Sequence, residues 1–284
     1  MTTMAINSST VSINSSTLAP NGGGSGPAPP TPYVPILKSI YNPYSEDKIV
    51  QITPSTAGFT STFSMTTWVK VTVSHGNRSF LSIKDASGTR NNAIHLGYYQ
   101  SGATQCVSLD VYNGAGSRRQ AGLYNVLGDN TIIGNWCHIT FTWNGAIGGA
   151  KVYKNGVVMN KLVNYADSDG TGMTDDADRV VRVGCDYYTA GNHWGYFYSG
   201  AFYTVELDQL NVTALYNAAD GTTMDQMNNS GGYTQSAACV SMYMPGAGTD
   251  AAGFGLDRGQ DASRHCIGAS WDSDNLYDDI PNGS

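Results

Sequence analysis

The acidic side chains are the first place where this chain could carry out chemistry. Hydrolysis of a glycosidic bond with retention of configuration needs two carboxyl groups, an acid and a nucleophile, about 5–5.5 Å apart. Glu46 and Glu206 are the only glutamates, and Glu206 and Asp208 form the one Glu-x-Asp motif. No third carboxylate follows at the same spacing, so we expect this pair to lie at a strand end without a catalytic role.

Other catalytic signatures are missing as well. The sequence contains no His-Glu-x-x-His, Gly-x-Ser-x-Gly or Walker motif, each of which places catalytic or phosphate-binding groups at a fixed spacing. The five histidines are scattered. His138 alternates with apolar residues, so we expect it to be solvated or hydrogen-bonded on the polar face of a strand. The sequence therefore predicts a protein that is not an enzyme.

An aspartate-rich segment is a candidate calcium site, since calcium takes about six to eight oxygen ligands in proteins. Its spacing does not match an EF-hand loop, and a solvated acidic loop is the alternative. No other cofactor is expected. The candidate ligands are Asp167, Asp169, Asp175 and Asp176, followed by Asp178.

A glycine-containing segment further along combines aromatic rings with planar polar groups. Binding pockets favour aromatic walls with a few polar groups, and loops at the rim of a scaffold often carry function. The segment predicts a glycan or receptor site; the alternative is that Trp194 and Tyr196 pack into the following strand. The candidate residues are Tyr187, Tyr188, Asn192, His193, Trp194 and Tyr196.

Short β-strands are the elements that would position these side chains. Residues 136–143 alternate between apolar and polar side chains, which predicts a half-buried strand. Residues 151–154 then lead into Asn155 and Gly156, a two-residue hairpin turn signal. The apolar face of the first strand comprises Cys137, Ile139, Phe141 and Trp143.

The same period of two recurs along most of the chain and predicts an all-β, two-sheet antiparallel sandwich. One short helix is expected at about 211–218. Further strands are predicted around Phe63–Val71, Leu81–Ile83, Ile94–Tyr98, Val107–Val111, Val181–Val183, Tyr203–Leu207 and Val240–Met244.

Several of these segments, in order, resemble the laminin-G-like family. The resemblance covers about residues 46–245 and implies a jelly-roll sandwich of the concanavalin A-like class, whose members mostly bind ligands and only sometimes cleave them. The acidic pair that the family carries in its last segment is missing here. The matching segments are Lys48–Ile52, Phe63–Val71, Phe80–Asp85, Gly134–Gly156, Arg179–Gly184 and Tyr198–Ala218.

The C-terminal part carries a narrower resemblance. Residues 239–250 and 259–281 are similar to the tails of laminin-G-like proteins in tailed-phage virions. This resemblance implies a protein on the surface of a virion.

The N-terminal segment differs from the rest of the chain. It carries no charged side chain before Lys38, repeats the sequence INSST, and continues into a Gly/Ser/Pro-rich stretch. Such a composition buries too little apolar surface to order itself, so a disordered tail is one interpretation. We favour an extended attachment arm, residues 1–35, that adds as a strand to a partner, followed by a jelly roll at 36–284 with an irregular acidic tail. The anchoring side chains would be Ile6, Val11, Ile13 and Leu18.

Charge and cysteine content exclude several classes of protein. A formal net charge of −7 argues against binding to nucleic acid or to an anionic membrane. No apolar run approaches the ~18 residues that span a bilayer, and no Lys or Arg stands where a secretory signal would begin. Five cysteines without a Cys-x-x-Cys pair predict neither a disulfide framework nor a zinc site. A single disulfide bond is the alternative.

Together these features predict a non-enzymatic virion surface protein of a tailed phage, made in the host cytoplasm. It would serve as a capsid decoration or as part of a fibre or appendage. The expected partners are a capsid or appendage protein held by the arm, further copies of the same chain, and a cell-surface glycan. The first alternative is a carbohydrate-binding or adhesion module outside any virion, and the second is an unusual glycosidase.

Overall fold

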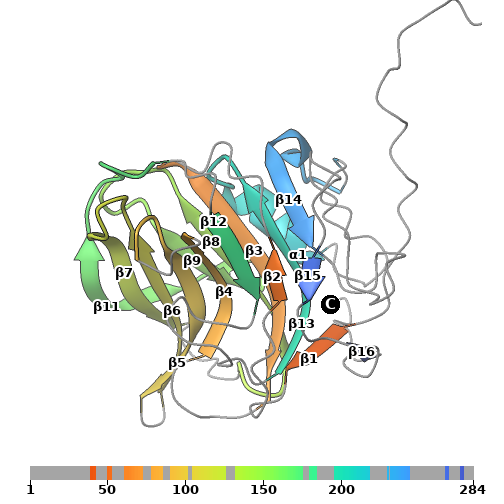
Figure 1. Ribbon diagram of the computed structural model, residues 1–284. Coiled ribbons are helices and arrows are strands. Elements are labelled where there is room, and N and C mark those ends of the chain that lie inside the picture. Colours follow the sequence, from red (N-terminus) through yellow and green to blue (C-terminus); the bar gives the residue numbers. More distant parts are fainter. Residues whose placement is uncertain are drawn as a thin grey trace, which may run out of the picture. The chain divides into compact units, whose positions relative to one another are not determined.

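The computed structural model of the protein describes residues 39–42, 50–52, 61–72, 78–85, 90–101, 104–125, 132–174, 179–183, 195–217, 229, 231–243, 266–268 and 276–277. All of them belong to one unit, residues 34–284. Figure 1 shows their strands in two facing layers. The predicted all-β sandwich of two antiparallel sheets is therefore confirmed.

Sheet A contains the strand predicted at 136–143 and its hairpin partner. Within it, β1 (Ser39–Asn42) and β14 (Cys239–Tyr243) pair with different halves of β13 (Gly195–Tyr203). Its order is β10 (Val157–Val158), β9 (Lys151–Lys154), β8 (Trp136–Trp143), β3 (Phe63–Val71), β13 (Gly195–Tyr203), β1 (Ser39–Asn42) and β16 (Leu276–Tyr277), with β14 (Cys239–Tyr243) also on β13.

Sheet B faces sheet A across the core. Its order is β11 (Asn160–Asp167), β7 (Arg118–Asn125), β6 (Thr104–Tyr112), β5 (Ile94–Ser101), β4 (Arg78–Asp85), β12 (Arg179–Val183), β2 (Val50–Ile52) and β15 (Cys266–Gly268). A short 3₁₀ helix, Ser236–Ala238, precedes β14.

The core forms where the apolar side chains of the two sheets meet, as the period of two predicts. Phe63 packs edge-on against Phe141 and Trp143, with ring centroids 5.3 and 6.0 Å apart. The buried residues of sheet B that join them include Ile94, Leu96, Tyr98, Val107, Leu109 and Val111. The alternating residues of each strand consequently point to the outer face of their sheet.

The hairpin between β9 and β10 turns where the sequence predicts it. Asn155 and Gly156 both have positive φ, 51° and 77°, as the favoured two-residue hairpin turn requires. The Asn155 side chain also accepts a hydrogen bond of 2.9 Å from the backbone N–H of His138. The turn is thereby tied to the neighbouring strand β8.

The strand predicted at 203–207 is misplaced. Tyr203 is the last residue of β13, so Val205 and Leu207 lie in the connection to the helix α1, Gln209–Asn217. The helix begins two residues earlier than predicted because Asp208 caps it. One carboxylate oxygen of Asp208 accepts the backbone N–H of Asn211 at 2.9 Å, which satisfies an otherwise unpaired amide of the first turn.

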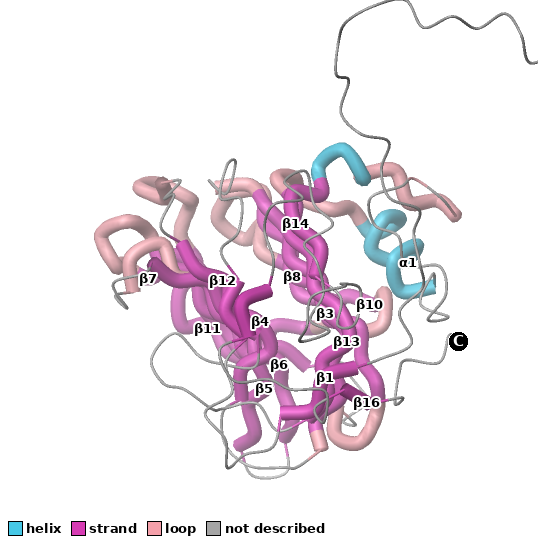
Figure 2. Tube along the Cα trace, turned by 45° about the vertical axis from the view of Figure 1, so that its right-hand side comes forward, coloured by secondary structure: helices cyan, strands magenta, loops and turns pink. Residues whose placement is uncertain are grey.

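Helix α1 covers the outer face of sheet A. Figure 2 shows it on the side of sheet A that faces away from sheet B. The Tyr216 ring of α1 stacks on Trp68 of β3 with centroids 5.8 Å apart. The polar face of β8 is consequently buried as well as its apolar face, so the prediction of a half-buried strand is wrong for its central residues.

Several predictions fall on residues that the structure does not describe. These are the attachment arm at 1–35 with its anchoring side chains Ile6, Val11, Ile13 and Leu18, and most of the acidic tail. They stay predictions.

Candidate functional site

Two partly exposed aromatic rings and a lysine lie side by side on the outer face of sheet A. Trp136, Lys70 and Tyr196 come from the adjacent strands β8, β3 and β13 and are direct cross-strand neighbours. All three are partly exposed. We call these three residues the aromatic platform.

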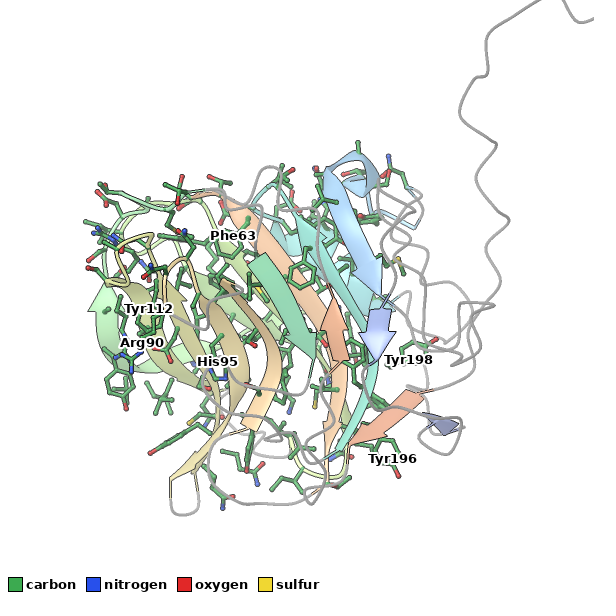
Figure 3. The ribbon with its side chains drawn as sticks, in the orientation of Figure 1. Phe63, Arg90, His95, Tyr112, Tyr196 and Tyr198 are labelled. Atoms are coloured by element: carbon green, nitrogen blue, oxygen red, sulfur yellow. The ribbon has the colours of Figure 1, made fainter. Side chains whose placement is uncertain are left out.

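The contacts within the platform fix the rings relative to each other. The Trp136 and Tyr196 rings are tilted, with centroids 6.2 Å apart, and Lys70 Nζ lies 5.5 Å from the Tyr196 centroid. The fully buried Tyr198 packs edge-on against Trp136, with ring centroids 6.2 Å apart. Figure 3 shows Tyr196 and Tyr198 in the first half of β13, where β1 pairs with it. The platform is thus a pair of neighbouring rings, one of them packed against a buried tyrosine, with the Lys70 ammonium group near the other.

Next to the platform, the same sheet face is closed. His138 is 1% exposed and its ring lies 5.2 Å from that of Trp68 and 6.4 Å from that of Tyr216. Neither ring nitrogen of His138 has a hydrogen-bond partner among the described residues. The expectation of a solvated or hydrogen-bonded histidine is therefore wrong, because Tyr216 of α1 covers it.

This burial keeps His138 uncharged. Desolvation of the ring lowers its pKa from 6.5 to about 3, since a buried imidazolium would lose its hydration without gaining a partner. A histidine with this pKa stays neutral near pH 7 and does not act there as an acid or a base. His138 is a packing residue in the layer between β8 and α1.

A second cluster of functional groups lies on the outer face of sheet B. Tyr112 ends β6, pointing away from the core, and is 2% exposed. The guanidinium carbons of Arg90 and Arg118 lie 5.7 and 5.6 Å from its ring centroid. Arg118 also donates to the Tyr112 hydroxyl at 3.1 Å and pairs with Asp110 at 3.1 Å. We call Arg90, Asp110, Tyr112 and Arg118 the arginine–tyrosine cluster.

Further along the same sheet face lies His95, which the sequence did not single out. Its Nε2 is 2.7 Å from the Ser79 hydroxyl, and it is the direct cross-strand neighbour of Asp110. Figure 3 shows His95 on the same side of the molecule as Arg90 and Tyr112. The outer face of sheet B is accordingly polar and charged, whereas the aromatic platform on sheet A is mainly ring surface.

The described aspartates of the predicted calcium site accept hydrogen bonds from nearby backbone and side-chain N–H groups. Asp167 Oδ1 accepts hydrogen bonds from the Gly148 N–H at 2.7 Å and from Gln120 Nε2 at 2.9 Å. Burial would raise the pKa of Asp167, but these two bonds and the nearby Lys161 outweigh it and hold the pKa below its ordinary value. Asp169 accepts the Thr171 N–H at 3.1 Å.

These aspartates do not form a metal site by themselves. Among the described residues, no group of three or more His, Cys, Asp or Glu side chains is placed to hold a metal ion. Asp175 and Asp176 lie outside the described residues. The calcium site stays a prediction, because the two described aspartates do not form a metal site by themselves.

The Glu-x-Asp motif has contacts that serve the fold. Glu206 Oε1 pairs with Lys151 Nζ at 2.9 Å, and this hydrogen bond raises the pKa of Lys151. Asp208 caps α1, and its bonds from the backbone and side chain of Asn211 lower its pKa. Each carboxylate is thus engaged with a separate structural partner.

Of the predicted glycan or receptor site, Tyr196 is the one residue that the structure describes. It lies in β13, while Tyr187, Tyr188, Asn192, His193 and Trp194 lie outside the described residues. Tyr196 meets Trp136 and Lys70, which the sequence did not connect with it. The signal for Trp136 was present, since it falls on the polar face of its strand, but nothing local indicated the neighbouring strands.

Buried cysteine thiols are a further feature of the described part of the chain. Cys106, Cys137 and Cys239 are buried and carry no disulfide, and burial raises the pKa of the Cys106 thiol. No helix in the described part of the chain has the length and apolar character to cross a membrane.

A family comparison matches the part of the chain that contains most strands of both sheets. Residues 45–214 match the concanavalin A-like lectin/glucanases superfamily. The chain belongs to this family. The predicted resemblance to concanavalin A-like jelly rolls is thereby confirmed at the level of the fold, and neither the family nor the structures below bear on a virion.

The comparison with solved structures gives matches at low sequence identity. A candidate carbohydrate-binding protein of Bacteroides ovatus is 13% identical, with a TM-score of 0.52 over 82% of this chain and 58% of its own. A heptameric pentraxin of Limulus polyphemus is 15% identical, with a TM-score of 0.49 over 64% of this chain and 82% of its own. The comparison with curated proteins gives no match.

Proposed function

We propose that this protein is a non-enzymatic carbohydrate-binding module that holds a sugar against the aromatic platform. The observation that carries the proposal is the arrangement of Trp136, Lys70 and Tyr196 in one row across three adjacent strands. Partly exposed rings on a sheet offer flat apolar surface to the C–H face of a sugar, and Lys70 Nζ adds hydrogen-bond donors for hydroxyl groups. Because the rings already pack against neighbouring side chains, they lose little conformational entropy when a sugar binds.

The family supports the same conclusion. Its description unites lectins, which bind sugars, with glucanases, which cleave them. The Bacteroides ovatus protein with the same fold is itself described as a candidate carbohydrate-binding protein. These likenesses favour the alternative of a carbohydrate-binding module over the virion protein, which is supported by the C-terminal sequence resemblance and the N-terminal composition.

The absence of hydrolysis is part of the proposal. Glycosidase chemistry needs one carboxyl group to act as an acid and a second as a base or nucleophile. Glu206 and Asp208 are tied to Lys151 and to the first turn of α1, so neither is held toward a common substrate position. We expect no turnover on a broad panel of polysaccharides. Turnover that disappears in Glu206→Gln would contradict this.

The experiment that tests the binding site compares two tyrosines. A glycan array first selects a ligand, and its affinity is then measured by titration calorimetry with Tyr196→Ala and Tyr165→Ala. Tyr165 is a matched control, because it is 57% exposed on the edge strand β11 of the other sheet. By analogy with stacking of bases on aromatic side chains, Tyr196→Ala should cost about 1–3 kcal/mol of binding. Tyr165→Ala should cost nothing measurable.

Two results would contradict the proposal. The first is an array on which no glycan binds the folded protein. The second is a selected glycan whose affinity is the same in wild type, Tyr196→Ala and Trp136→Ala, which would place the sugar elsewhere on the molecule. Thermal melts of each variant show whether a loss of binding comes from a loss of fold.

A further inference from the structure

The outer face of sheet B presents two arginines around one buried ring, far from the aromatic platform. Figure 3 shows Arg90 and Tyr112 together at one side of the molecule, with Tyr196 and Tyr198 at the other. Both guanidinium groups lie within 5.7 Å of the Tyr112 centroid, so they lie within about twice that distance of each other. The platform and this cluster are therefore two separate surfaces.

The guanidinium groups are held in place by the chain around them. Arg118 is fixed by Asp110 and by the Tyr112 hydroxyl, at 3.1 Å each. Arg90 belongs to a turn that is tied to the end of β6. In that turn the Arg90 carbonyl accepts the Ala93 N–H at 3.1 Å, and the Ala93 carbonyl accepts the Tyr112 N–H at 2.8 Å. A ligand that contacts both arginines meets donors whose backbone is already ordered.

The charge of the cluster favours an anion. Arg90 and Arg118 carry two positive charges, and Asp110 supplies one negative charge among the described side chains. The Arg118 side chain is 41% exposed while that of Asp110 is 20% exposed, so the positive partner of this ion pair is the more accessible to solvent. Arginine presents parallel N–H donors that match the two oxygens of a carboxylate or sulfate group.

We propose that the arginine–tyrosine cluster binds the acidic group, a carboxylate or a sulfate ester, of an acidic saccharide. The cluster is a second site in addition to the aromatic platform, and the proposal rests on the proposed function in one respect, that the ligand is a saccharide. The Tyr112 ring supports the two guanidinium groups through its face and its hydroxyl. The protein thus binds saccharides on both sheets, with an acidic group required on sheet B alone.

The test measures affinities of the full chain by titration calorimetry. The probes are three hexasaccharides of equal length: a galactose hexamer, a galacturonic acid hexamer and a sulfated galactose hexamer. At least one acidic hexamer should bind about tenfold more tightly than the neutral one, and added sodium chloride should weaken that preference. Preference for the galacturonic acid hexamer assigns the carboxylate as the ligand, and preference for the sulfated hexamer assigns the sulfate ester.

The variants separate direct contact from net charge. Arg90→Gln and Arg118→Gln should each weaken binding of the acidic hexamer about tenfold or more. Arg119→Gln is the matched control, because it removes the same charge one residue away. The Arg119 side chain lies instead near Asp169 and Gly172. Since Arg118 also contacts Asp110 and Tyr112, a thermal melt is recorded for each variant. If Arg118→Gln is unstable, the result for Arg90→Gln is the decisive one.

The results that would overturn the inference differ from those that would overturn the proposed function. Equal affinity for neutral and acidic hexamers, or an equal loss in Arg119→Gln and Arg90→Gln, overturns the acidic site while binding at the platform stands. The inference is also overturned if Tyr196→Ala loses the preference for the acidic hexamer while Arg90→Gln keeps it. That result would assign the anion to the aromatic platform. No binding of any saccharide overturns both.

Discussion

At the residue scale, the buried His138 shows how completely α1 changes the character of sheet A. A histidine whose ring nitrogens have no described partner gains nothing from its polarity. Its ring lies beside both Trp68 and Tyr216, which also stack on each other, so the three rings form one aromatic cluster. The side chain acts as a packing ring, and its lowered pKa follows from its burial.

This arrangement predicts a defined pH dependence of stability. In the unfolded chain His138 titrates near 6.5, while in the fold its pKa is about 3. As the pH falls below about 6.5, the unfolded state binds a proton that the folded state excludes, so stability is lost progressively down to about pH 3. The loss from this residue should reach roughly 5 kcal/mol at the acid end.

His138→Phe isolates that contribution. Phenylalanine keeps a ring in the aromatic cluster and removes the titrating group, so the variant should equal or exceed wild type in stability at pH 7. Unfolding free energies from urea titrations across pH 4–7 should diverge, with the variant increasingly the more stable protein as the pH falls. Parallel curves for the two proteins would show that His138 does not take up a proton on unfolding in this range.

At the element scale, α1 is the part of the fold on which the outer face of sheet A depends. The helix is short, and its start is defined by Asp208, which accepts hydrogen bonds from both the backbone and the side chain of Asn211. An isolated helix of this length is marginal in water, so capping and packing have to hold it. Tyr216 supplies the packing and Asp208 the cap.

Asp208→Ala should therefore destabilise the domain by about 1 kcal/mol. Asp208→Asn is the control, since asparagine caps helices about as well and removes the charge. Chemical denaturation at neutral pH should rank the free energies of unfolding as wild type close to Asp208→Asn, with Asp208→Ala below both. Equal losses in the two variants would assign the effect to charge and not to the cap.

The sequence predicts some of these elements and misses others for one physical reason. The hairpin turn at Asn155 and Gly156 and the core faces of β3, β6 and β8 were predictable, because they follow from local backbone chemistry and a period of two. The burial of His138 and Trp68 was not, because the helix that covers them comes from a distant part of the chain. Local alternation shows that a strand has two faces, but not what lies on each.

At the scale of the whole molecule, the two sheets expose different chemistry. Sheet A is covered by α1 over its centre and leaves the aromatic platform partly exposed at one end. Sheet B carries the charged groups Arg90, Arg118 and Asp110 on its outer face. The candidate site was only partly predictable, since Tyr196 was singled out with its sequence neighbours, whereas its partners Trp136 and Lys70 are brought to it by strand pairing.

The most direct test of the central claim is to observe the platform itself while a sugar binds. The tryptophan indole N–H signals of the isotope-labelled protein would be followed by nuclear magnetic resonance during titration with the glycan selected on the array. Trp143 is an internal control, because it is fully buried and its indole N–H donates to the Ala146 carbonyl at 3.0 Å. We predict that the Trp136 signal shifts in a saturable way while the Trp143 signal stays in place. A glycan that binds to saturation without moving the Trp136 signal would contradict the account.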